Sequence, residues 1–266
     1  MSLELRAPHN DRLSLELPVE TAQLRTPFNR SIYAEDGRPF SIERNIVQLV
    51  ENKQSFDTLA QLSNHISITA QLYETLWRRR SISLLSGEDF SLNEEKKLLI
   101  DWTGPTRGDT ILDVGCSTAF YARNLQDFEP SSQTVALDLS FPMLQKARQK
   151  AIKDKVDLFL LQADARQIPF YNDTFDIIAM GGTLNEVSNT AQVLTEIRRV
   201  LRPNGRFFIM YLLKSNHWLG RIAQKSSSLA GLHFWTYKES KKLFNGAGFT
   251  INRIKTKGIV AFALLS

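Results

Sequence analysis

The run ILDVGCSTAF, residues 111–120, decides the fold. Its apolar start is typical of a buried strand, and the carboxylate of Asp113 lies near the strand end. The chain then turns through small residues, from Gly115 to Ala119, into a helix expected from Phe120 onward. Small residues let a ligand approach backbone N–H groups at a helix N-terminus, where partial positive charge favours an anionic group. The run therefore predicts a strand–turn–helix unit with a ligand site at the turn.

After residue 105, short β-like runs alternate with helical segments, which is the signature of a parallel α/β sheet. The expected strands are 110–114, 134–138, 157–162, 175–180 and 206–212. Two last strands, 249–254 and 258–265, are close enough in sequence to pair as an antiparallel hairpin.

Polar residues mark the expected helix starts. Ser91 and Thr236 are each followed by a glutamate three residues later, which is a capping box. Ser140 and Asn189 are single N-cap candidates, and the apolar stripe that follows Asn189 ends before the Pro-Asn-Gly turn at 203–205.

The chain divides by composition. Residues 1–67 are rich in turn formers and are expected to form an N-terminal accessory region, whereas 68–266 are expected to form the main domain. Near its start, a helical pattern closes on three arginines at 78–80. The connection at 213–234 is unusually long and mixes apolar with basic residues. It predicts a lid over a binding site, or a surface helix packed on the sheet edge.

Two more expected strands end in carboxylates. Asp138 follows the second strand, 23 residues after Gly115, where a carboxylate can accept both hydroxyls of a ribose. It could also cap the helix that starts near Ser140. Asp164 follows the third strand and can accept from an exocyclic amine, or it is a plain loop residue. Three acidic strand ends in register favour a shared ligand site.

The runs LDVGCSTAFYARNL, VALDLSFPMLQKAR, LQADARQIPFYNDTFDIIAM and RRVLRPNGRFFI together resemble a class I S-adenosylmethionine-dependent methyltransferase. The resemblance is strongest to the small-molecule group that includes the ubiquinone and menaquinone methyltransferases, and it covers about residues 91–266. It implies a Rossmann-like, doubly wound α/β sheet of seven strands with an antiparallel last strand. It also implies S-adenosyl-L-methionine as cofactor.

Carried onto this chain, the resemblance implies a methionine-binding turn, a ribose carboxylate, an adenine subsite flanked by a phenylalanine, and a glycine near the sulfonium. In that order, the implied cofactor-binding residues are Asp113, Gly115, Cys116, Ser117 and Ala119; Asp138; Phe141, Asp164 and Ala165; and Gly181. Family members usually have glycine where this chain has Ser117 and Ala119. A positive φ at Ser117 would cost about 1–2 kcal/mol.

The composition is that of an ordinary globular protein, with 42% hydrophobic and 23% charged residues and a net charge of +5. One cysteine excludes an intramolecular disulfide and a multi-cysteine zinc site, so no metal is expected and a reducing compartment is indicated. The first 20 residues have no apolar core of the kind a secretory signal needs. The longest apolar run, 258–265, is too short to span a bilayer. We therefore expect a cytoplasmic protein, with peripheral membrane contact left open.

The leading functional hypothesis is methylation of a small hydrophobic or aromatic metabolite, such as a quinone or isoprenoid precursor, beneath the lid. The sequence leaves open an RNA methyltransferase, although it lacks the aromatic-basic interleaving of single-strand binders and so disfavours nucleic acid. A cofactor-binding protein without turnover is the third reading. The sequence specifies neither the oligomeric state nor a catalytic residue; the candidate bases are Asn185, Glu186, Tyr211, His217 and His233.

Overall fold

The computed structural model describes residues 4–6, 14–15, 29–34, 37–50, 91–229 and 231–266. Within these ranges, ten strands form one mixed sheet in the order β11-β12-β10-β9-β6-β7-β8-β5-β4-β3. The strands are β3 (Arg30–Tyr33), β4 (Pro39–Glu43), β5 (Ile46–Gln48), β6 (Thr110–Val114), β7 (Gln133–Asp138), β8 (Phe159–Gln162), β9 (Phe175–Gly181), β10 (Leu201–Leu212), β11 (Ile251–Lys257) and β12 (Val260–Leu265).

Strands β6 to β12 make up the seven-stranded unit that the sequence predicts. β8, β7, β6, β9 and β10 run parallel to one another, and β12 lies antiparallel between β10 and β11. The order reverses direction at β6, so the turn after β6 lies at the switch point of the sheet, where open α/β sheets bind ligands.

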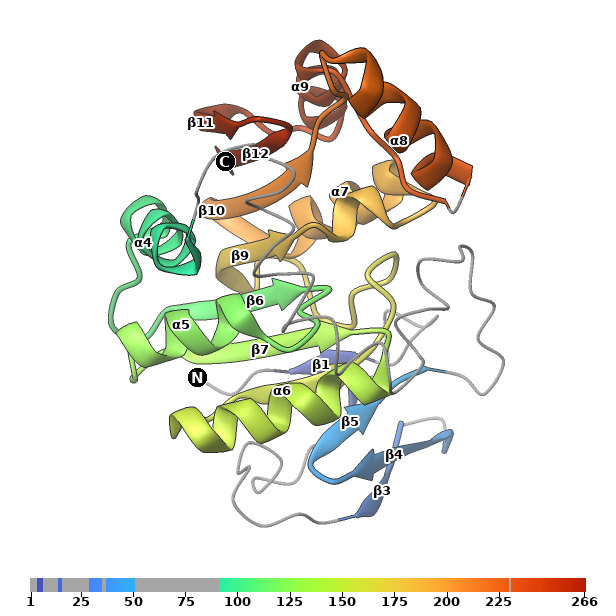
Figure 1. Ribbon diagram of the computed structural model, residues 1–266. Helices are drawn as coiled ribbons and strands as arrows, with labels where there is room; N and C mark the ends of the chain where they lie inside the picture. Colours follow the sequence, from blue (N-terminus) through green and yellow to red (C-terminus); the bar gives the residue numbers. More distant parts are fainter. Residues whose placement is uncertain (1–3, 7–13, 16–28, 35–36, 51–90, 230) are drawn as a thin grey trace.

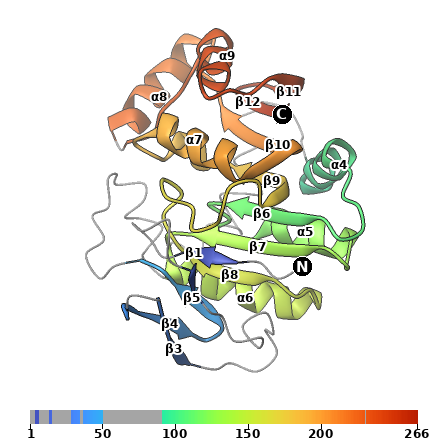
Figure 2. The ribbon, with the colours of Figure 1, turned by 180° about the vertical axis from the view of Figure 1, so that it is seen from behind.

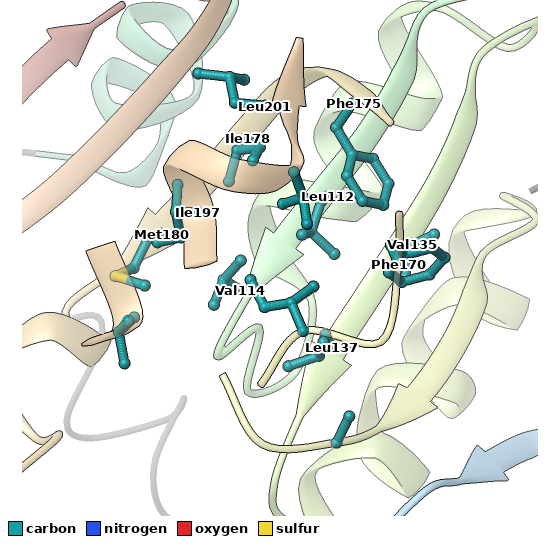
Figure 3. Close-up of a cluster of buried hydrophobic side chains, with 14 of the residues drawn as sticks. Leu112, Val114, Val135, Leu137, Phe170, Phe175, Ile178, Met180, Ile197 and Leu201 are labelled. Carbon is teal, nitrogen blue, oxygen red and sulfur yellow. The ribbon is translucent and has the colours of Figure 1, made fainter. Parts of the chain in front are cut away.

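Helices cover both faces of the sheet, as Figures 1 and 2 show from opposite sides. Leu112 and Val114 of β6 pack toward α7, whereas Ile111 packs toward α4 and α5. Figure 3 shows the first of these clusters, with side chains from β6, β7, β9 and α7 interlocking. The helices are α4 (Leu92–Thr103), α5 (Phe120–Phe128), α6 (Phe141–Asp154), α7 (Thr190–Val200), α8 (Trp218–Leu229) and α9 (Tyr237–Gly246), with a short 3-10 helix η3 (Thr183–Asn185).

The predicted helix starts are confirmed. Ser91 and Thr236 each form a complete capping box, with Glu94 and Glu239 respectively, and Ser140 and Asn189 accept from the backbone at the starts of α6 and α7. These caps satisfy N–H groups that would otherwise have no helical partner, which explains why local sequence located them correctly.

Part of the expected accessory region belongs to the sheet itself. β5 pairs in parallel with β8, with Ile46 opposite Leu160, and β4 and β3 extend the sheet in antiparallel fashion. A second two-stranded sheet, β1 (Leu5–Arg6) and β2 (Ser14–Leu15), contributes the fully buried Leu5 to the core. Composition did not reveal this pairing. The boundary expected at 67/68 and the arginines at 78–80 lie outside the described residues.

The long connection at 213–234 contains α8. The Gln224 side chain links α8 to the segment that precedes it. Its amide oxygen accepts from the Ser215 backbone N–H, and its amide nitrogen donates to the Leu213 carbonyl. The surface helix that the sequence allowed is therefore present, and closure of this segment over a substrate stays a prediction. Among the described residues, no helix is both long enough and apolar enough to cross a membrane.

Candidate active site

A pocket opens at the carboxyl ends of β6, β7, β8 and β9. The empty space within it is about 770 Å³, which includes open solvent at its mouth. The lining residues are Gly115, Ser117, Leu137, Asp138, Leu139, Ser140, Met143, Ala163, Asp164, Ala165, Arg166, Gly181, Thr183, Glu186 and Val187.

The turn after β6 approaches η3 so closely that only glycine fits at its first position. Gly115 has a φ of +63°, and a Cβ atom there would lie 2.2 Å from the Thr183 Oγ1 and 2.7 Å from the Thr183 Cβ. The Thr183 hydroxyl also donates to the Gly115 carbonyl at 3.1 Å. Thr183 therefore ties the turn to the end of β9.

Asp113 supports the turn from behind. It is 1% exposed, and its Oδ2 accepts from the Ala122 backbone N–H at 2.9 Å. The N-cap of α5, Ala119, has no side-chain cap hydrogen bond. The carboxylate of Asp113 thus supplies the acceptor, and the negative charge, that the first turn of a helix favours.

Both positions where the family usually has glycine adopt the left-handed backbone region. Ser117 has a φ of +52° and Ala119 a φ of +59°. The strain that the sequence allowed at Ser117 is present, because a Cβ atom in this region crowds the following carbonyl oxygen.

Replacing Ser117 with glycine should raise the free energy of unfolding by about 0.5–1 kcal/mol. The gain is the relieved strain, about 1–2 kcal/mol, less the greater chain entropy of glycine in the unfolded state. Ala119→Gly is the matched variant, because it relieves similar strain but removes a fully buried methyl group worth about 0.8 kcal/mol. Urea unfolding should therefore rank Ser117→Gly above Ala119→Gly; the reverse order would contradict the strain at Ser117.

Asp138 joins β7 to the turn after β6 and to the start of α6. Its Oδ2 accepts from the Ser117 N–H at 2.7 Å, and its Oδ1 accepts from the Ser140 N–H at 2.8 Å. Asp138 therefore caps the start of α6, which is one of the two roles that the sequence analysis considered for it. Each of its carboxylate oxygens can still accept a further hydrogen bond from a ligand in the pocket. Burial raises the pKa of Asp138 above its ordinary value, although hydrogen bonds from Ser140, Ser117 and Leu139 oppose the rise.

This raised pKa predicts opposite pH effects on cofactor binding and on stability. A ligand that needs the carboxylate of Asp138 should lose affinity as the pH falls through the raised pKa, at a higher pH than for an ordinary aspartate of pKa about 3.9. Without ligand, the contribution of Asp138 to the free energy of unfolding should increase over the same fall, because the folded state binds the proton more tightly than the unfolded state. Calorimetry of cofactor binding and urea unfolding from pH 4 to 8 would test both signs, and parallel trends would contradict them.

Asp164 forms an ion pair inside the pocket. Its two oxygens receive the Arg166 Nε at 3.1 and 3.0 Å, and its Oδ2 also receives the Arg166 Nη2 at 2.7 Å. The Arg166 backbone N–H bonds to Oδ1 at 2.8 Å. Most of the acceptor capacity expected for an exocyclic amine is therefore engaged by Arg166, which sequence reasoning did not single out.

Gly181, at the end of β9, lies so close to the Tyr121 ring that a side chain at this position would not fit. A Cβ atom there would lie 2.8 Å from the Tyr121 ring, and the Tyr121 hydroxyl donates to the buried Glu95 at 2.6 Å. The Tyr121–Glu95 pair joins α5 to α4 behind this wall of the pocket, so a side chain at position 181 would have to displace it.

The structure brings six of the ten predicted site residues to the pocket lining: Gly115, Ser117, Asp138, Asp164, Ala165 and Gly181. The other four are not among the lining residues. Asp113, Cys116 and Ala119 are buried beneath the turn, and Phe141 packs against the apolar cluster between α5 and α6. Burial raises the pKa of the Cys116 thiol well above its ordinary value, which excludes a ready thiolate.

Of the five candidate bases, Glu186 alone is among the residues that line the pocket. Asn185 is buried, and its side chain binds the backbone of Leu212 and His233. Tyr211 is fully buried and its hydroxyl lies 3.1 Å from the Ser240 hydroxyl. Both histidines are exposed. Thr183, Met143 and Arg166 also line the pocket, and the sequence analysis did not predict them as site residues. A local sequence signal existed only for Arg166, which lies two residues after Asp164.

Comparisons with known proteins identify the class. A family model described as a methyltransferase domain matches residues 112–209. The demethylmenaquinone methyltransferase of Lactiplantibacillus plantarum is 30% identical over 164 residues, which cover 52% of this chain and 69% of that protein. The 2-phytyl-1,4-naphtoquinone methyltransferase of Trichormus variabilis is 31% identical over 133 residues, covering 49% of this chain and 58% of that protein. The chain spans about half the length of several other curated relatives.

The fold agrees with these similarities. The crystal structure of a SAM-dependent methyltransferase from Aquifex aeolicus superposes with a TM-score of 0.58 at 21% identity, over 75% of this chain and 97% of that one. The chain therefore belongs to the class I S-adenosylmethionine-dependent methyltransferases. It is an enzyme of this class, and its cofactor is S-adenosylmethionine.

The pocket fits this cofactor in three respects. The close approach of Gly115 and Thr183 makes a narrow turn at a helix N-terminus, suited to the anionic end of an amino acid. Asp138 places a carboxylate at the end of the neighbouring strand, where a ribose is commonly bound. Ala163 and Ala165, on either side of Asp164 after β8, line the pocket with small side chains.

Proposed function

We propose that this enzyme methylates a quinone-type acceptor, a hydrophobic aromatic ring of naphthoquinone character. The observation that carries the proposal is the likeness, at about 30% identity, to two methyltransferases whose names specify demethylmenaquinone and 2-phytyl-1,4-naphtoquinone. The pocket supports a small-molecule acceptor, because Leu137, Met143 and Val187 contribute apolar lining beside its polar strand ends.

In this proposal, the turn at Gly115 and Ser117 holds the methionine portion of the cofactor, and Asp138 binds the ribose hydroxyls. The backbone N–H of Ala165 binds the adenine ring, and Asp164, held in place by Arg166, faces the exocyclic amine. Gly181, in the pocket lining at the end of β9, lies beside the sulfonium. Asp113, Cys116 and Ala119 act indirectly, by fixing the shape of the turn, and Phe141 does so by packing the start of α6 against the neighbouring apolar cluster.

The chemistry demands orientation more than side-chain reactivity. When bound, the cofactor supplies an electrophilic methyl group. The rigid strand ends restrict how the acceptor can lie against it, which is the main source of rate in such a transfer. An aromatic carbon that gains a methyl group must lose its hydrogen as a proton, and the carboxylate of Glu186 in the pocket wall is the group we assign to receive it.

Methyl transfer to defined acceptors tests this function. The purified protein, with S-adenosylmethionine labelled in the methyl group, should label a prenylated demethylnaphthoquinol in detergent. Glu186→Gln should lower the turnover number about 10²–10⁴-fold with cofactor affinity unchanged. Labelling of RNA with no labelling of quinols would overturn the acceptor. Cofactor binding without labelling of any acceptor would favour a protein that does not turn over.

A further inference from the structure

Helix α8 presents large apolar side chains to solvent. Trp218 is 69% exposed and Ile222 is 57% exposed. They lie four residues apart and therefore occupy one face of the helix. Exposure of a tryptophan and an isoleucine side by side on a helix marks an interaction surface more often than an isolated apolar residue does.

Cations flank this apolar pair. Arg221 and Lys225, both exposed, fall within the same arc of α8 as Trp218 and Ile222, and α8 contains no acidic residue. A helix with exposed Trp and Ile beside Lys and Arg is the type that lies in the plane of a membrane interface.

The surrounding sequence carries the same charge. Residues 213–257 contain nine Lys or Arg and one acidic residue, whereas the rest of the chain contains 24 Lys or Arg and 27 Asp or Glu. The one acidic residue, Glu239, is held by Lys214 at 2.9 Å and by its capping box. The positive charge of the chain is therefore concentrated in this segment.

Helix α9 continues the surface. Tyr237 is 48% exposed, and Lys238, Lys241 and Lys242 are exposed. Figures 1 and 2 show α8 and α9 beside each other beyond the carboxyl end of β10, on the side of the molecule toward which β6 and β7 point. The basic, apolar surface thus lies on the same side as the pocket mouth.

We propose that α8 and α9 form a docking surface for an anionic lipid bilayer, with Trp218 and Ile222 entering the headgroup region and the lysines and Arg221 facing lipid phosphates. Each basic residue near such a surface contributes attraction that falls off within a Debye length. RNA is the less favoured occupant, because Ile222, exposed beside Trp218, adds apolar area that offers no stacking plane to a base. A second copy of the chain is disfavoured by the repulsion of two equally basic surfaces.

Vesicle sedimentation tests the proposal independently of methyl transfer. The protein should bind phosphatidylcholine vesicles containing 30% phosphatidylglycerol, bind pure phosphatidylcholine at least tenfold more weakly, and dissociate as salt is raised. Trp218→Ser/Ile222→Ser should weaken binding at least tenfold, and Lys225→Glu/Lys241→Glu should do the same. S-adenosylmethionine affinity should stay unchanged in both variants, because none of these residues lines the pocket.

Tyr33→Ser/Phe128→Ser is the matched control, because Tyr33 is 61% and Phe128 is 53% exposed outside the proposed surface. This variant should bind anionic vesicles like the wild type. Equal binding by the Trp218/Ile222 variant, or no vesicle binding by the wild type, would overturn the proposal. It would also be overturned if RNA displaced the protein from vesicles while binding through the same lysines, or if the Trp218/Ile222 variant converted a lipid-free dimer to a monomer.

Discussion

Replacing Gly115 with alanine is expected to lower the free energy of unfolding by roughly 2–5 kcal/mol and to weaken S-adenosylmethionine binding at least about tenfold. The added Cβ would meet three atoms of Thr183 within 2.7 Å, and the φ of +63° would strain any L-residue. Thr183 cannot move far without losing its hydrogen bond to the Gly115 carbonyl. The turn that walls the pocket would shift instead.

The Gly108→Ala variant distinguishes the cost of a positive φ from the cost of a steric clash with a neighbouring side chain. Gly108 has a φ of +84°, but a Cβ atom there would meet nothing within 4 Å. It should cost only the strain, about 1–2 kcal/mol, and leave cofactor affinity unchanged. In a Thr183→Ala background, which removes two of the three colliding atoms, Gly115→Ala should cost less than in the wild type. Equal costs in calorimetric and urea measurements would show that the approach of Thr183 is not the cause.

The second large effect is expected for Asp138→Asn, which should weaken S-adenosylmethionine binding about 10–100-fold while changing the free energy of unfolding by less than about 2 kcal/mol. Charge-assisted hydrogen bonds to a ligand are worth about 1.5–3 kcal/mol each. In the folded protein, the amide loses one acceptor for the Ser117 or Ser140 N–H, but it also removes a charge whose burial raises the pKa of Asp138. These two effects on stability oppose each other.

Asp157→Asn is the control for this substitution, because Asp157 is exposed and does not line the pocket. Calorimetric titration should give it the affinity of the wild type. In the Asp138→Asn variant, the affinity for S-adenosylmethionine should also no longer fall at acidic pH, where Asp138 takes up a proton in the wild type. If the variant kept both the wild-type affinity and its decrease at acidic pH, Asp138 would not bind the cofactor.

Local sequence predicted much of the fold because its signals are local. The capping boxes at Ser91 and Thr236 depend on residues three apart, and the alternation of strands and helices depends on runs of a few residues. The closeness of Asp138 and Asp164 also followed from sequence, since both end parallel strands and such ends meet at one edge of a sheet.

Other features depend on contacts across long stretches of chain. β5 pairs with β8 over more than a hundred residues, and no local pattern in 46–48 specifies that partner. Asn185 was a candidate because of its expected position near the mouth of the site, but its side chain donates to the backbone carbonyls of Leu212 and His233. Asp113 was predicted to bind the cofactor, and the fold gives its Oδ2 a further role as acceptor for the Ala122 N–H at the start of α5.

The sequence alone therefore determined the order of the elements from 91 to 266, the ligand site at the turn after β6 and the class of ligand that its acidic strand ends suit, because these follow from periodicity, capping and turn chemistry. The tertiary structure decided which side chains face the pocket and which support it. It paired Arg166 with Asp164, set Thr183 over Gly115 and exposed Trp218 on a basic helix. Those outcomes depend on packing between distant segments, where burial and close approach, rather than local propensity, fix the position of each side chain.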